Sequence, residues 1–280
     1  MDALPAPGQI EVALLPGARA LLDAHAEELP QRDDLCGAFC GALALRAGGV
    51  LEQQGEPLDQ DAVAAVAGSV VSRVADPRCL PAGEHGRRDY RISPPLIDDA
   101  AVSGTTAAGL AHAIEELSGG SLAALPFSGP WSARALEGVF ELALSCEPSA
   151  AIVANLATRQ LWGSRAPLPE LLAYLYSGQQ QGPPPDWDVG HFSCIFGRAR
   201  GPSGTLYALA DTYPSLGSGG VHVQPAERLA LALERPLMPP GGAIVVVADA
   251  EAARVREGAA TLGLREQAWD NGTLAREMLA

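Results

Sequence analysis

The hydrophobic period of the chain changes near residue 150, and this change constrains the fold more than any other feature. Before it, apolar residues recur at helical spacing, for example over residues 105–120 and 133–144. After it, residues 150–162, 190–200 and 205–214 show the alternation and β-branched content of strands, with turn-rich segments between them. Helices followed by an antiparallel sheet predict an α+β fold.

The same pattern predicts how the chain is divided. We expect residues 1–235 to form one domain, with a helical part over about 1–145 and a sheet part over about 146–235. Residues 241–264 are typical of a buried strand followed by a helix, so we expect 236–280 to be a C-terminal βα extension packed on that domain. With 280 residues, 48% of them hydrophobic, the chain has enough apolar side chains for a large core.

Charge, hydropathy and cysteine content exclude several classes of partner. A net charge of −14 would repel phosphate backbones, so we expect no nucleic acid partner. No apolar run approaches the length of about 18 residues that a membrane span needs, and the first 30 residues lack the pattern of a signal peptide. Five cysteines are an odd number in a chain of this size, which argues against a disulfide framework. We therefore expect a cytoplasmic protein with reduced thiols.

Residues 31–49, QRDDLCGAFCGALALRAGG, carry the strongest indication of chemistry. Asp33 or Asp34 is a suitable N-cap for a helix, which places Cys36 in the first helical turn. A thiol is a useful nucleophile only as a thiolate, and a helix N-terminus favours that form. Cys40 follows one turn later on the same face, and we expect it to pack in the core.

A histidine and an aspartate that would complete a catalytic site lie on two later strands. His191 begins the strand at 190–200, and Asp211 ends the next strand, so a hairpin would bring the two side chains together. His222 is the alternative base. Gln31, five residues before Cys36, could donate its amide N–H to a developing oxyanion.

These motifs, Gln31 followed by DLCGAFC and then GHFSCIFG and LADTYP, resemble the bacteriocin-processing, double-glycine leader peptidases and their stand-alone relatives among the papain-like cysteine peptidases. The likeness spans about residues 28–225. It implies a papain-like fold in which Cys36 is the nucleophile and His191 the general base and acid. By the same resemblance Asp211 orients His191, and Gln31 is the oxyanion donor.

The expected function is a cysteine peptidase that cleaves a peptide or amide bond of a peptide or protein substrate, with removal of a leader from a ribosomally made precursor as one role. Two alternatives stay open. If an amine takes the acyl group, the protein is a transglutaminase-like or cyclising enzyme. Leu35 before the cysteine and the short spacing from Gln31 instead favour an inactive, peptide-binding scaffold.

Neither a cofactor nor a metal is expected, because no paired CxxC or HxxxH spacing completes a set of four ligands. The loop that contains Trp187, between two aspartates, is expected to overhang the cleft between the helical and sheet parts.

Overall fold

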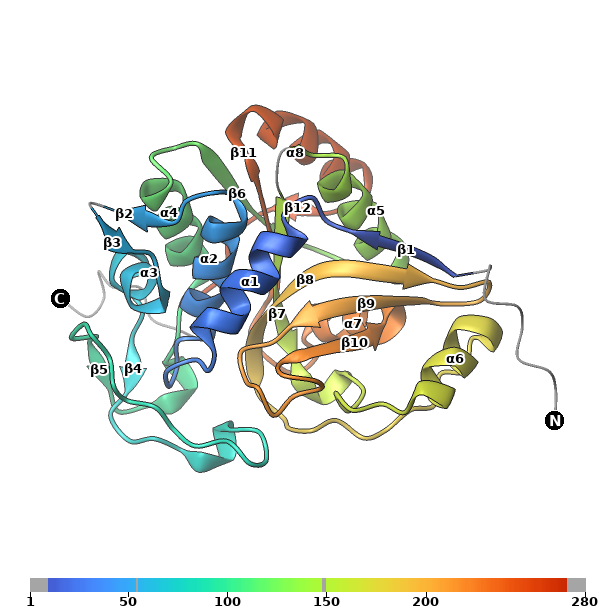
Figure 1. Ribbon diagram of the computed structural model, residues 1–280, viewed down its shortest axis with the longest axis horizontal. Helices are drawn as coiled ribbons and strands as arrows, with labels where there is room; N and C mark the ends of the chain where they lie inside the picture. The colour runs from blue at the N-terminus through green and yellow to red at the C-terminus, as the bar shows by residue number, and fades with distance from the viewer. Residues whose placement is uncertain (1–9, 54, 148–149, 271–280) are drawn as a thin grey trace.

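One large antiparallel sheet organises the protein in the computed structural model, which describes residues 10–53, 55–147 and 150–270 (Figure 1). The sheet has eight strands, and every pair of neighbours in it is antiparallel. Its strand order is β10 (Val221–Pro225), β9 (Thr205–Ala210), β8 (Gly190–Arg200), β7 (Ala150–Ala157), β11 (Gly242–Ala248), β6 (Leu122–Ser128) and β12 (Arg265–Glu266), while β1 (Glu11–Leu14) also pairs with β8. The predicted α+β class is confirmed.

Helices cover both faces of this sheet (Figure 1). One face packs against α1 (Ala18–Glu28), α2 (Cys36–Ala47), α3 (Gln60–Ala67) and α4 (Ala107–Leu117). The other packs against α5 (Ala133–Leu144), α7 (Ala226–Glu234) and α8 (Ala252–Thr261), and α6 (Leu168–Ser177) forms a smaller apolar cluster with β9. Because side chains alternate along a strand, the β7 neighbours Ile152 and Val153 belong to opposite cores.

Short strands and turns lie between the longer elements. A hairpin joins β2 (Glu52–Gln53) to β3 (Glu56–Pro57), and β4 (Val71–Ser72) pairs in parallel with β5 (Leu96–Ile97). Single turns of 3₁₀-helix occur at Pro77–Cys79, Ala100–Val102, Thr158–Gln160 and Asp249–Glu251. Within the described ranges, no helix is both long and apolar enough to cross a membrane.

Helix α2 lies at the centre of the helical layer, and its small residues allow the neighbouring helices to pack closely around it. It packs against α1, α3 and α4 as well as the sheet, and nearly all of its side chains are buried. A Cβ at Gly41 would lie 2.6 Å from Leu110 and 2.9 Å from Val63, so the helices approach one another only because this residue has no side chain. Within α2, only Cys36 in the first turn and Arg46 in the last turn are not fully buried.

The C-terminal segment is more than an addition to the rest. Strand β11, which belongs to the extension expected over 236–280, pairs with β7 on one side and β6 on the other. It is therefore an interior strand of the sheet. Strand β6 lies inside the region expected to be helical. The sequence pattern did not predict this strand, because residues 122–128 are buried on both faces and show no alternation.

Candidate active site

Cys36 is the first residue of α2 and is only partly buried. Its place in the first turn was predicted, but the predicted cap is wrong, since no side chain caps this helix. Asp33 Oδ1 instead accepts the backbone N–H of Arg87 at 2.8 Å. Asp34 Oδ2 accepts that of Ser72 at 2.7 Å. The N–H groups of the first turn, which have no acceptor inside a helix, are therefore left uncapped where Cys36 lies.

Gly37 fixes how closely this helix end approaches its neighbours. A Cβ at this position would lie 2.9 Å from Cβ of Thr105 and 3.2 Å from the ring of Phe192. Phe192 follows His191 in β8, so the close contact at Gly37 brings the residue next to Cys36 against the residue next to the histidine. Gly37, directly after Cys36, thus sets the distance between helix α2 and strand β8.

His191 and Asp211 form a buried pair at the β8–β9 hairpin. Asp211 directly follows β9, whose last residue Ala210 is paired with Cys194 of β8. Nε2 of His191 lies 2.9 Å from Oδ1 of Asp211, and both side chains are almost fully buried. The N–H of Thr212 donates to the same oxygen at 2.7 Å. The structure therefore brings together the histidine and the aspartate selected from the sequence.

Cys36 contacts the imidazole on its other side. Burial alone would lower the pKa of His191, but the charge and hydrogen bond of Asp211, together with a side-chain hydrogen bond and the charge of Cys36, raise this pKa to about 10. Since Nε2 faces Asp211, the contact with the thiol is made by Nδ1. At neutral pH His191 is therefore a cation that lies between a carboxylate and the Cys36 side chain.

The same contacts keep Asp211 ionised. Burial by itself would raise the pKa of this carboxyl group, but the charges and hydrogen bonds of His191 and His222 hold it well below its usual range. The carboxylate therefore stays an acceptor, and its role toward His191 is to fix the orientation of the ring.

Gln31 lines the same cleft and is held by Thr212. Its backbone N–H donates to the Thr212 carbonyl at 3.0 Å, and its side-chain oxygen accepts the Thr212 hydroxyl. Because that oxygen is occupied, the amide NH₂ end is the part of Gln31 that can donate to a ligand. The Thr212 hydroxyl also lies 3.3 Å from Nε2 of His191, so one residue links the oxyanion candidate to the base. Sequence analysis did not identify this role of Thr212.

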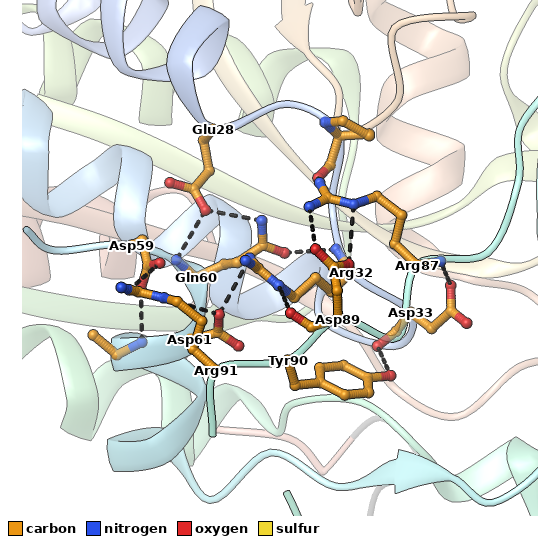
Figure 2. A network of polar contacts seen from close by, with 12 residues as sticks. Glu28, Arg32, Asp33, Asp59, Gln60, Asp61, Arg87, Asp89, Tyr90 and Arg91 are labelled. Carbon is orange, nitrogen blue, oxygen red and sulfur yellow. Dashed lines mark hydrogen bonds and ion pairs between the residues drawn. The ribbon is translucent and has the colours of Figure 1, made fainter. Parts of the chain in front are cut away.

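A polar network holds the segment that carries Gln31 (Figure 2). The backbone N–H of Arg32 donates to Gln60 of α3 at 2.6 Å. On the other side of Gln31, the Pro30 carbonyl accepts the Arg87 guanidinium at 2.6 Å. The backbone before and after the glutamine is thus fixed by two different parts of the chain.

His222, the alternative base, contacts Asp211 instead of the cleft. The Trp162 backbone N–H donates to Oε1 of Gln224, and the Trp162 carbonyl accepts from Nε2, at 2.8 and 2.9 Å. Nε2 of Gln224 is therefore the donor to Nδ1 of His222 at 3.2 Å. His222 then carries its proton on Nε2 and donates it to Oδ2 of Asp211 at 3.2 Å. An imidazole held in this way supports Asp211 and is not the base for Cys36.

His25, in α1, is a further support that sequence analysis missed. Its Nε2–H donates to the backbone carbonyl of Asp211 at 2.6 Å. Burial lowers the pKa of His25, although Asp211 partly opposes this, so the ring is neutral at pH 7. Gly220 packs on this ring, with φ of +83° and no room for a Cβ, which would lie 2.8 Å from Cε1. No local pattern reveals a contact between residues 186 positions apart.

Aromatic side chains enclose the imidazole at a cleft of about 460 Å³ that Cys36, His191 and Gln31 line. The Trp187 ring lies 4.8 Å from the His191 ring and 5.6 Å from that of Tyr213, measured between centroids. Tyr213 stacks on His191 with a centroid distance of 6.2 Å. Trp187, which belongs to the loop expected to overhang the cleft, is one of the residues that line it.

Cys40 and Cys194, the other cysteines of the quoted motifs, are part of the core. Cys40 is fully buried, and burial together with Cys194 raises its pKa well above the usual range. The prediction that Cys40 packs in the core is confirmed. All five cysteines are free thiols.

Comparison with known proteins gives a family match over most of the chain. A family model with the description "Family of unknown function (DUF6885)" matches residues 15–270. No curated protein matches the chain.

Proposed function

This chain belongs to the DUF6885 family, whose description names no activity, and we propose from the geometry of its site that it is a cysteine peptidase or amidase that hydrolyses a peptide or amide bond. The observation that carries the proposal is the unbroken series of contacts from Cys36 through His191 to Asp211 at the wall of the cleft. A base with a partner that orients it, beside a thiol at an uncapped helix end, is the arrangement that nucleophilic catalysis requires.

The reaction follows from these contacts. The Cys36 thiolate attacks the carbonyl carbon of the substrate, and the oxyanion that forms accepts hydrogen bonds from the amide of Gln31 and the first-turn N–H groups of α2. The His191 imidazolium gives its Nδ1 proton to the nitrogen of the leaving amine, and a thioester to Cys36 remains. Water then attacks the thioester, His191 takes the water proton, and the acid product leaves with the thiolate restored.

The proposal includes the papain-like fold and a peptide substrate. It is supported by the arrangement of the two halves of the site, because the cysteine starts a buried helix while the histidine and the aspartate lie on the adjoining antiparallel sheet. Removal of a leader from a ribosomally made precursor in the cytoplasm is the role that the resemblance to double-glycine leader peptidases suggests.

A peptide-library digest tests the proposal. The purified protein is incubated with a mixture of synthetic peptides, and new termini are identified by mass spectrometry. We expect cleavage that Cys36→Ala abolishes and that Cys79→Ala preserves, since Cys79 also lines the cleft but has no histidine partner among the described residues.

A thiol-directed peptidyl electrophile provides the second readout. It should attach to Cys36 in the folded protein. A protein that binds peptides, cleaves none of them and leaves Cys36 unlabelled would contradict the proposal and identify the scaffold alternative.

A further inference from the structure

Arg235 is a buried arginine in the wall of the same cleft. It follows α7, is 3% exposed, and its Nη1 donates to Oδ1 of Asn155 at 2.7 Å. Its Nη2 lies over Gly190, where a Cβ would be only 2.6 Å away. Gly190 directly precedes His191, so the guanidinium lies next to the strand residue that carries the base.

This guanidinium has no carboxylate partner among the described residues. The equally buried Arg198 shows the usual arrangement, since it forms ion pairs with Glu137, Glu141 and Glu11. Within the described part of the chain, Arg235 forms no ion pair, and its Nε has no hydrogen-bond acceptor. Burial lowers the pKa of Arg235 to about 10, against the opposing charge of Cys36, so the side chain remains a cation at neutral pH. An unpaired buried cation is costly unless a ligand supplies the anion.

Residues with a strained backbone also line this cleft. In the described ranges, the non-glycine residues with a left-handed backbone are Asp34, Arg235 and Leu237, with φ of 64°, 50° and 69°. All three line the cleft. Strained residues of this kind concentrate at ligand sites, where the surrounding structure holds them in place. Leu237 is 97% exposed, which leaves a large apolar side chain at the rim beside the guanidinium.

We propose that Arg235 binds a carboxylate of the substrate and holds it beside the bond that Cys36 attacks. The inference rests on the proposed function for the position of that bond, while the anion site itself depends only on the guanidinium. Among the described residues that line the cleft, Arg235 is the only arginine. Three other lining residues, Asp33, Asp34 and Asp76, would repel an anion, so Arg235 is the position at which one can bind. The substrate is therefore a peptide or amide with a carboxylate at Arg235 and an apolar group on the side of Leu237.

A matched pair of alkylating reagents tests the assignment at Cys36. Iodoacetate carries the carboxylate and iodoacetamide its neutral equivalent, and each rate is divided by that of the same reagent with a small free thiol. We expect the normalised preference for iodoacetate to fall about ten-fold in Arg235→Gln, the effect of one charged hydrogen bond, and to be largely kept in Arg235→Lys. If Arg235→Gln slows both reagents equally, Arg235 serves the thiolate and the assignment is wrong.

A binding measurement separates this inference from the proposed function. In Cys36→Ala, where no thiol competes for the guanidinium, N-acetylglycine should raise the melting temperature while N-acetylglycinamide should not. Arg235→Gln in the same background should remove the effect, and its absence from the parent would overturn the anion site. A comparison with N-acetylaspartic acid α-amide tells a terminal carboxylate from a side-chain one. If Cys36 resists both alkylating reagents but the carboxylate still binds, the proposed function fails and the anion site stands.

Discussion

Removal of the imidazole at residue 191 should expose how much of the reactivity of Cys36 depends on it. The His191 ring stays protonated to a pKa of about 10, so a positive charge lies against the thiol throughout the neutral range. An ordinary thiol with a pKa of about 8.5 is only about 0.3% thiolate at pH 6. The imidazolium is expected to speed alkylation by favouring the thiolate. A more stabilised thiolate is a weaker nucleophile, which offsets part of that gain in rate. We therefore expect His191→Ala to slow alkylation of Cys36 by about ten-fold at pH 6.

The assay is peptide mass mapping after timed treatment with iodoacetamide at pH 6, 7.5 and 9, with the exposed Cys79 as a reference in the same chain. The difference between the wild type and His191→Ala should close by about pH 9, where an ordinary thiol is itself mostly ionised. Equal rates at pH 6 would refute the reasoning, because the imidazolium would then have no effect on the thiol. Circular dichroism of the variant controls for loss of fold.

Three further predictions follow from the same contacts. Gln31→Ala should leave a folded enzyme whose kcat is lower by about 10²- to 10³-fold, measured on any peptide that the wild type cleaves. Asp211→Asn should slow labelling of Cys36 at pH 6 less than His191→Ala does, because the carboxylate acts on the thiol only through the ring. In thermal melts, the stabilisation from His191 should be complete below its unfolded pKa of 6.5 and should be lost as the pH rises toward 10. The stabilisation from Asp211 should be lost as the pH falls below the unfolded pKa of that group, 3.8.

Elements with a strong local pattern could be predicted closely from the sequence. Helix α5 occupies residues 133–144 and β8 occupies 190–200, as the period and the flanking turns indicated. Strand β6 could not be recognised, since its run LAALPFS is apolar on both faces and contains a proline. The position of β11 between β6 and β7 is a pairing between distant segments, which hydrophobic period does not specify.

The candidate site divides in the same way. Cys36, His191 and Asp211 were selected from short motifs, because each stands at the end of a helix or strand with a clear period. The N-cap prediction failed because the side chains of Asp33 and Asp34 accept from backbone groups far along the chain. Contacts of this kind depend on tertiary packing, and a local capping rule does not include them.

The hydrogen bonds around Asp211 explain why a buried carboxylate can hold one orientation. Oδ1 accepts from His191 and from the N–H of Thr212, Oδ2 accepts from His222, and the backbone carbonyl accepts from His25. Rotation of the carboxylate would break at least one of these bonds in a place where water cannot replace it. Because Asp211 is fixed, Nε2 of His191 is fixed as its donor, and Nδ1 is left facing Cys36. The two extra histidines thus act on the thiol at a distance, through the ring orientation of the one histidine that contacts it.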